Sequence, residues 1–267
     1  MPLPFLLIGA CALRAGVVAH NVVKIKEAKE TVKFAKECYA EDKERLEKEN
    51  NSTIKSLSKL QDLEKQVIKS FNDFTNVFEK IKNRPKFAEL HKKDIKLPEF
   101  NLEEIKDFSI GSYAVLGFLG SSITGLVGDI VFSFVGKKVS DKAEEILTQV
   151  VDLEKKINEA CKYLSSLKRI ANKFYKSIDN VYRIYQEHLV KLSVIVEERG
   201  HVNWKTFTEE EKLITENTVL LVGGLYDMCK VELLVKNKDG GERSTINSKT
   251  INESIRKADT VISKVAA

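Results

Sequence analysis

The chain has 267 residues, a formal net charge of +5 and charged side chains at 31% of its positions. Lysine and glutamate are interleaved, as on solvated helix faces, and there is no zinc-finger spacing, ribonucleoprotein aromatic pattern or basic arm. The composition therefore argues against nucleic-acid binding. A disulfide framework is also not expected, because the four cysteines stand singly along the chain, as Cys11, Cys38, Cys161 and Cys229.

Residues 1–23 form an apolar N-terminal segment interrupted by Arg14 and His20. Its uncharged core, Leu3 to Leu13, is too short to span a bilayer. No lysine or arginine precedes it, so a secretion signal is not expected. We predict that Pro4 to Val18 either packs beside the central apolar run or lies in the plane of a membrane interface as an amphipathic anchor.

Residues 24–107 are predicted to contain a first long helix, from Lys24 to Asn83, followed by a connector. Apolar residues recur in steps of three and four from Ile54 to Ile81, as on a helix with one buried stripe. The stretch before this stripe, residues 41–51, contains only one large apolar residue and is expected to be exposed or loosely paired. The polar residues Asn50, Asn51 and Ser52 are a possible break between two helices.

The connector contains Pro85 and Pro98, and the residue before each proline is disfavoured in helical conformation. We predict an irregular segment between them, with at most one short helix. Asn101 is a suitable N-cap for a helix that leads into the apolar run, because Glu103 and Glu104 suit the positive end of a helix dipole.

Residues 108–137 are the most distinctive part of the chain. No charged side chain occurs in residues 108–128, and a helix of that length covers roughly 30 Å, the hydrocarbon thickness of a bilayer. Small residues recur every four positions, which favours close helix packing in lipid. The predicted membrane and packing residues are Phe108, Gly117, Gly120, Ser121, Thr124, Gly125, Gly128, Asp129, Phe132 and Phe134. The predicted interfacial basic residues are Lys106, Lys137 and Lys138.

This apolar run permits two interpretations. It is either a membrane-competent helix or hairpin, including one that is stored buried and released later, or the buried central hairpin of a soluble helical bundle. Asp129 discriminates between them. In a permanent core its carboxylate needs a basic or hydrogen-bonding partner, whereas in a membrane segment it should lie at a helix contact or at the interface.

Residues 138–200 are predicted to form a second long helix, with Ser140 as its N-cap and Gly200 at its end. An apolar stripe runs from Ile146 to Ile195 and includes Cys161, which is predicted to be a small buried hydrophobe. Because the two long helices are similar in length, we expect them to pair antiparallel as a coiled-coil-like stalk, with the apolar run at the hairpin end.

Residues 201–267 are predicted to form a pair of helices. Thr208 and Glu211 have the spacing of a capping box, which starts a helix expected to continue to about Val235. Its segment from Val219 to Leu225 is apolar on every side and is expected to be buried. Residues 238–241 (KDGG) predict a turn, and the final helix is expected to cover residues 248–265.

No arrangement of residues indicates catalysis. The histidines, His20, His91, His188 and His201, lack metal-ligand spacing with one another, and are expected to be solvated or packed. Neither glycine pair has the lysine and hydroxyl of a phosphate-binding loop, and no nucleophile elbow occurs. We therefore expect no enzyme activity, cofactor, metal or small-molecule substrate.

Two resemblances follow from this layout. The N-terminal MPLPFLL, the charged long helices on either side of a glycine-rich apolar middle, and the TEEEK helix start at Thr208 resemble a group of uncharacterised bacterial proteins often labelled "chemotaxis protein". The chain lacks transducer-type methylation helices, so a chemotaxis role is not predicted. The architecture is similar to the α-helical pore-forming toxins of the haemolysin E class, which implies an apolar element that is packed in the soluble form and inserts on oligomerisation.

Together these features predict an all-α, elongated helical bundle or coiled-coil stalk with a central apolar hairpin. The predicted function is membrane association without catalysis, with the lipid bilayer as partner and a homo-oligomer or another helical protein as further partner. The protein would be membrane-associated, or soluble with conditional insertion. The alternative is a soluble coiled-coil scaffold whose apolar middle is a buried core.

Overall fold

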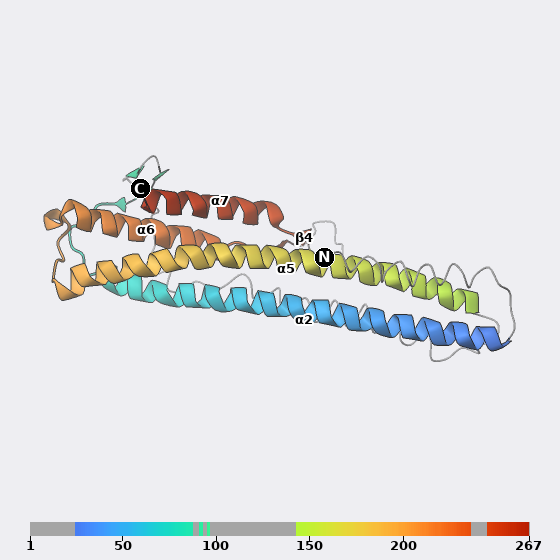
Figure 1. The fold of residues 1–267 in the computed structure, drawn as a ribbon. Helices are drawn as coiled ribbons and strands as arrows, with labels where there is room; N and C mark the ends of the chain where they lie inside the picture. The colour runs from blue at the N-terminus through green and yellow to red at the C-terminus, as the bar shows by residue number, and fades with distance from the viewer. Residues whose placement is uncertain (1–24, 88–90, 93–94, 97–142, 236–244, 267) are drawn as a thin grey trace. The chain divides into compact units, whose positions relative to one another are not determined.

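The computed structural model describes residues 25–87, 91–92, 95–96, 143–235 and 245–266. These residues are mostly helical, which confirms the all-α prediction (Figure 1). The α-helices in this part of the chain are α2 (Ile25–Phe78), α5 (Ala143–Ser193), α6 (Glu209–Cys229) and α7 (Ser248–Val265). A π-helix, η2 (Val194–Glu198), directly follows α5, and a short 3-10 helix, η3 (Trp204–Thr206), precedes α6.

The chain divides into two compact units, and both long helices contribute to each. In the described residues, unit 1 contains residues 25–54 of α2 and residues 143–168 of α5. Unit 2 contains the remainder of α2 and α5 together with α6, α7 and two small pairs of strands. Both long helices continue without a break through the boundary between the two units.

The two long helices run parallel, so the antiparallel prediction is wrong. In unit 2, the Tyr185 hydroxyl donates to the Ser70 carbonyl at 3.0 Å, and further along both helices the Lys80 ammonium donates to Glu197 at 2.5 Å. Residue numbers therefore rise together on the two sides, and the colour gradients of α2 and α5 run the same way in Figure 1. The isolated bridge between Lys82 and Asn203 is also parallel.

The length of the connection explains why the sequence did not decide this direction. A parallel pair needs a connection that returns along the helices, at about 3.3 Å per extended residue against about 1.5 Å per helical residue. Residues 79–142, between α2 and α5, are numerous enough for that return. A hydrophobic stripe has the same periodicity whichever way the partner helix runs, so periodicity carried no information on direction.

The first half of α2 is better packed than predicted. The helix continues through Asn50, Asn51 and Ser52 without a break, and Leu46 is only 1% exposed. Thr53 is fully buried in unit 1, where its hydroxyl lies 2.8 Å from the Glu49 carbonyl and 3.2 Å from the Leu164 carbonyl on α5. A hydroxyl that is satisfied in this way is compatible with a helix interface, so polar composition here does not mean exposure.

The C-terminal helices match their predicted starts more closely than their ends. The capping box between Thr208 and Glu211 is present at the start of α6, and α7 covers the predicted residues 248–265. However, α6 ends at Cys229 and not near Val235, because the chain turns into a strand pair. This pair is β3 (Leu234–Val235) with β4 (Thr245–Ile246), antiparallel, with Leu234 opposite Ile246. The turn predicted at residues 238–241 lies outside the described residues.

A second small strand pair lies in the connector, for which the sequence predicted an irregular segment with at most one short helix. β1 (His91–Lys92) pairs antiparallel with β2 (Ile95–Lys96), with His91 opposite Lys96. Both strand pairs have only two residues on each side, and such short elements leave little periodic signal in a sequence.

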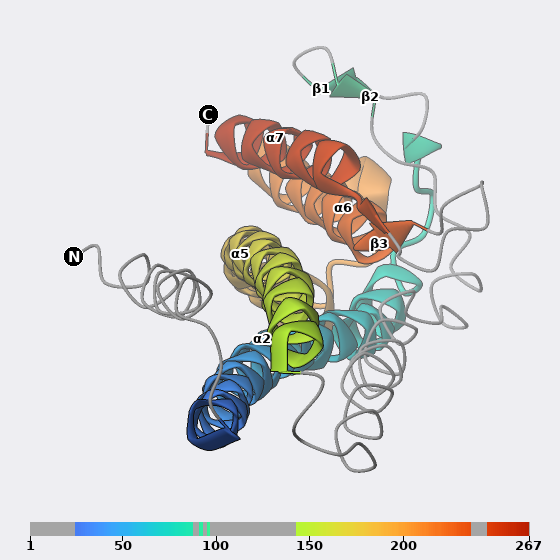
Figure 2. The same ribbon diagram turned by 90° about the vertical axis from the view of Figure 1, so that its right-hand side faces the viewer.

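The core of unit 2 is formed by side chains from all its helices. Phe71, Phe74, Phe174, Ile178 and Tyr185 are among its fully buried residues. Residues 217–223 of α6 are buried without interruption, as predicted for this segment, and α6 and α7 lie side by side (Figure 2). A Cβ added at Gly224 would meet Val261 of α7 at 3.6 Å, which shows how closely these two helices approach.

Candidate functional site

The predicted membrane segment lies outside the described residues. This applies to Phe108, Gly117, Gly120, Ser121, Thr124, Gly125, Gly128, Asp129, Phe132 and Phe134, to the basic residues Lys106, Lys137 and Lys138, and to the N-terminal segment 1–23. The capping role of Asn101 is also outside the described part. Among the polar groups that the structure does place are two clusters, a charged seam in unit 1 and a hydrogen-bonded corner in unit 2.

The charged seam consists of Asp42, Arg45 and Glu49 on α2 with Glu154 and Lys168 on α5, all in unit 1. Lys168 Nζ donates to Glu49 Oε1 at 2.6 Å, and both side chains are about three-quarters buried. Arg45 Nη2 donates to Asp42 Oδ1 at 2.7 Å. A partly buried pair of this kind is costly to break, because removing one partner leaves the other charge desolvated.

Two carboxyl groups of the seam, those of Asp42 and Glu154, have raised pKa values. Burial raises the pKa of Asp42, although Arg45 opposes the rise, and burial together with the negative charge of Asp42 raises the pKa of Glu154. Glu154 is 9% exposed. These two carboxylates therefore take up protons at a higher pH than free ones do, so the charge of the seam changes with acid. This sensitivity does not provide a nucleophile.

Cys161 belongs to the same region of unit 1. Burial raises the pKa of its thiol, and the charges of Arg45, Glu49 and Asp42 act on it. The side chain is half-buried, so the prediction of a small buried hydrophobe is corrected to a partly exposed one. The correction has a physical reason: the face of α5 that holds Cys161 meets charged residues of α2 instead of a purely apolar stripe.

The corner between α5 and α6 is held by a set of short contacts in unit 2. Gly200 has φ +69°, a conformation that glycine adopts without strain, and it turns the chain after η2. His201 Nδ1 then lies 2.8 Å from Glu211 Oε1. The other Glu211 oxygen accepts from the Thr208 backbone N–H at 3.0 Å, while the Thr208 hydroxyl accepts from the Glu211 N–H at 3.2 Å.

These contacts determine the acidity of Glu211. Burial favours its protonated form, but hydrogen bonds from Thr208 and His201 and the charge of His201 outweigh burial and lower its pKa. The Glu211 side chain is 6% exposed, and Arg199 Nη1 lies 3.9 Å from its Oε1. The group is thus a structural carboxylate that joins two helices.

An aromatic cluster lies near this corner. Phe78 at the end of α2 contacts Phe87, Phe87 contacts Trp204 at 5.5 Å between ring centroids, and Trp204 contacts Phe207. Arg84 covers the Phe78 ring at 4.6 Å and donates to the Phe78 carbonyl. The cluster attaches the start of the connector to the α5–α6 corner.

The remaining chemical predictions concern metals, histidines and cysteines. Within the described ranges no group of histidine, cysteine or carboxylate side chains is arranged to hold a metal ion. The His188 ring bonds the Ile184 carbonyl at 2.9 Å, while His20 and the His91 side chain lie outside the described part. Cys38, Cys161 and Cys229 form no disulfide bond in the part of the chain that the structure describes. None of the helices described is both long and apolar enough to cross a bilayer.

Sequence reasoning missed the two features that the structure assembles. The His201–Glu211 contact had a usable signal, since a glycine turn and a capping box only a few residues apart bring the two side chains to the same corner. The charged seam had none, because Glu49 and Lys168 are far apart in sequence and meet only through parallel pairing.

Comparison with models of protein families, with curated proteins and with solved structures finds no match to this chain. The two resemblances drawn from the sequence therefore stay predictions.

Proposed function

We propose that the protein is a non-enzymatic, membrane-associating helical protein that inserts into bilayers through residues 108–136. The observation that carries this proposal is the absence of charge from residues 108–128 in a chain where 31% of residues are charged. A segment of that length suits the hydrocarbon thickness of a bilayer. Insertion would be driven by transfer of apolar area out of water, at about 25 cal/mol per Å².

The parallel pairing of α2 and α5 supports this proposal. The apolar run belongs to the connection that leaves α2 in unit 2 and enters α5 in unit 1. Both neighbouring helices are held by their own contacts, such as Tyr185 with Ser70 and Lys168 with Glu49. The connection would therefore move into lipid while the helix pair that anchors its two ends stays intact.

The spacing of small residues supports self-association after insertion. Gly117, Ser121 and Gly125 fall four apart, as do Gly120, Thr124 and Gly128, so a helix through this run would have two tracks where backbones approach closely. An inserted oligomer that perturbs or permeates the bilayer is the form of the function that these tracks favour.

Flotation of the full chain with neutral phosphatidylcholine liposomes tests the proposal. The test variant is Gly120→Arg with Val127→Arg, which places two charges in the apolar run. The matched control is Leu213→Arg with Val235→Arg, because these side chains are 46% and 43% exposed and the same two charges are added at a surface that is already solvated. We expect the first variant to lose flotation and the control to retain it, with both keeping the helical circular dichroism of the parent.

A soluble coiled-coil scaffold is the second candidate, and the charged seam favours it. Pairs such as Glu49 with Lys168 set register and partner choice between helices more than they add stability. Failure of the intact chain to float, with residues 108–136 protected from proteolysis in solution, would replace the membrane proposal with this one. Equal flotation of both arginine variants would place the membrane contact elsewhere in the chain.

A further inference from the structure

We propose that the solvent-facing side of α5 in unit 2 docks on anionic lipid headgroups. This inference rests on the proposed membrane function and names the lipid chemistry that the protein recognises before insertion. The docking surface, here called the basic face, consists of Arg169, Lys173, Lys176 and Arg183, with Val190 at its end.

The basic face follows from a seven-residue recurrence on a continuous helix. Arg169, Lys176, Arg183 and Val190 are successive positions seven apart, and all four are exposed. Seven residues make nearly two turns, and the drift of about 20° per heptad leaves these positions on one side of the helix. They lie opposite the buried stripe of Phe174, Ile178 and Tyr185, so they form the outermost line of α5 in unit 2.

The charges on this face are not neutralised by ion pairs. In the described part of the chain Arg169, Lys173, Lys176 and Arg183 have no carboxylate within salt-bridge distance, unlike Lys155, Lys168 and Lys212. Arg183 donates to Asn180 at 3.0 Å and Lys173 to Asn252 of α7 at 2.8 Å, and both acceptors are neutral amides. These cations therefore remain available to a partner.

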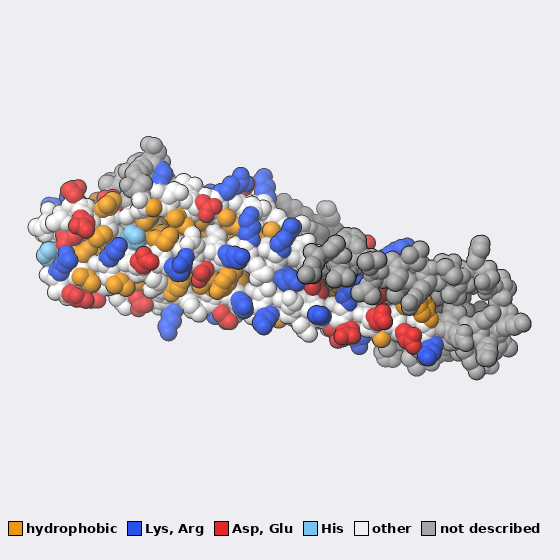
Figure 3. Space-filling view, in the orientation of Figure 1, with side chains coloured by type: hydrophobic (Ala, Val, Ile, Leu, Met, Phe, Trp, Pro, Cys, Tyr) orange, Lys and Arg blue, Asp and Glu red, His pale blue; other side chains and the backbone are white. Residues whose placement is uncertain are grey.

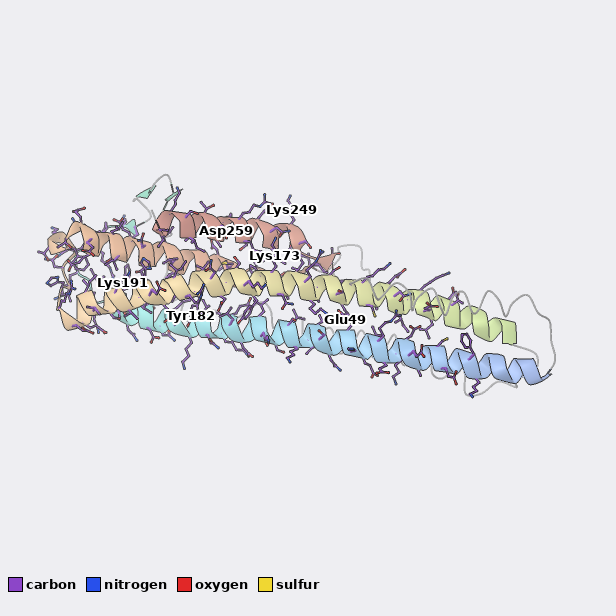
Figure 4. All side chains as sticks on the ribbon, viewed as in Figure 1. Glu49, Lys173, Tyr182, Lys191, Lys249 and Asp259 are labelled. Atoms are coloured by element: carbon purple, nitrogen blue, oxygen red, sulfur yellow. The ribbon has the colours of Figure 1, made fainter. Side chains whose placement is uncertain are left out.

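Neighbouring acidic residues border the basic face but do not neutralise its positive charge. On α5, the half-buried Asp179 lies at its margin and Glu187 follows Arg183 by one turn. On α7, Glu253 and Asp259 are offset by Lys249, Arg256 and Lys257. Figure 3 shows basic side chains gathered over the middle of α5 and the adjoining part of α7, and Figure 4 shows Lys173 between these helices with Lys249 close by.

The side chains on the face favour a lipid surface over a nucleic acid. Val190 continues the line of positive charges and is 62% exposed, the highest value among the large hydrophobic side chains described. An apolar side chain beside cations suits the boundary between headgroups and acyl chains. There the cations contact anionic headgroups and the apolar side chain contacts acyl chains. Stacking of bases needs exposed aromatic rings, whereas Tyr175 and Tyr182 of α5 are only partly exposed and lie off this line.

The test compares two triple variants of the full chain that remove the same charge. Arg169→Gln, Lys176→Gln and Arg183→Gln neutralise the basic face, and Lys55→Gln, Lys59→Gln and Lys69→Gln neutralise three exposed lysines of α2 in the same unit. Binding is measured by flotation with phosphatidylcholine vesicles, with and without phosphatidylglycerol, at low and high salt. Each basic residue near an anionic surface contributes about a fivefold factor, so the basic-face variant should lose roughly 100-fold in binding to anionic vesicles.

The expected result is loss of salt-sensitive binding in the basic-face variant alone, with unchanged insertion into neutral vesicles and unchanged thermal unfolding. Equal binding by the two triple variants would overturn the docking proposal and leave the insertion proposal standing. Conversely, salt-sensitive binding that survives Gly120→Arg with Val127→Arg but is lost in the basic-face variant would separate docking from insertion. If the basic-face variant loses binding to duplex DNA while its vesicle binding is unchanged, the lipid proposal fails.

Discussion

His201 Nδ1 lies 2.8 Å from Glu211 Oε1, so one hydrogen bond joins the residue after the α5 turn to the first turn of α6. The same carboxylate completes a reciprocal capping box with Thr208. One buried acid therefore satisfies the N-terminus of α6 and bonds the residue that follows the α5 turn, which makes this corner a sensitive point for the stability of unit 2.

Acid should weaken this corner. Because the folded-state pKa of Glu211 is lowered below its ordinary value of 4.5, its contribution is fully present above pH 4.5 and is lost as pH falls through the folded value. Glu211→Gln should cost about 1 kcal/mol at neutral pH, the scale of a lost cap contact. The parent and variant should converge in stability as pH falls from 4.5 through the lowered folded-state pKa. Urea unfolding across this range checks the prediction, and parallel curves at all pH values would contradict it.

The charged seam of unit 1 should respond to acid with the opposite sign. Burial and Asp42 raise the pKa of Glu154 above its ordinary 4.5, so its ionised form costs stability at neutral pH, and this cost disappears as pH falls through the raised value. Glu154→Gln should therefore stabilise the protein by about 1 kcal/mol at pH 7 and have no benefit below pH 4.5. Exposed Glu44→Gln in the same unit is the control, with little expected change. Denaturant midpoints that fall for Glu154→Gln at pH 7 would show that its carboxylate is stabilising.

The same substitution at two glycines should have opposite effects. Gly200 has a left-handed φ of +69°, so Gly200→Ala should cost about 1 kcal/mol although nothing lies within 4 Å of the added Cβ. Gly224 is helical and an added Cβ meets Val261 at an ordinary 3.6 Å, so Gly224→Ala should gain about 0.5–1 kcal/mol from helix propensity. Thermal and urea unfolding of the two variants check the signs. A loss at Gly224 would mean that α6 and α7 cannot accept one methyl group.

A zero-length carbodiimide cross-linker should report the parallel direction of α2 and α5. Lys80 Nζ and Glu197 Oε1 are 2.5 Å apart, and Lys168 and Glu49 form the corresponding contact in unit 1. Peptide mass spectrometry should find both amide links in the monomer, each lost after Lys→Arg substitution of its lysine. Links from Lys80 to carboxylates in the first turns of α5 would instead show an antiparallel pair.

The hydrogen bond of the buried Tyr185 hydroxyl should contribute less to the free energy of unfolding than the packing of its ring does. Tyr185 donates to the Ser70 carbonyl at 3.0 Å, and its ring packs edge-on against Phe71. Tyr185→Phe keeps the ring and removes one hydrogen bond, so it should cost about 1 kcal/mol. Tyr185→Ala also removes the packing and should cost about 3–5 kcal/mol. Equal losses in urea unfolding would show that the hydroxyl, and not the ring, carries the contribution.

The sequence by itself determined the features that depend on neighbours along the chain. Helix positions followed from apolar residues at steps of three and four, the start of α6 from Thr208 and Glu211, and the end of the α5 region from Gly200. These signals are local, because caps, turns and stripes involve residues within a few positions of one another. The candidate membrane segment was also identified in this way, from its composition alone.

Only the tertiary structure decided which helix faces meet and in which direction. The parallel course of α2 and α5 was not predictable, because a stripe looks the same from either end and residues 79–142 are long enough for both arrangements. The seam that joins Glu49 with Lys168 depends on that choice, and so does the raised pKa of Glu154. Contacts between residues more than a hundred positions apart leave no spacing in the sequence, and burial and acidity follow from those contacts.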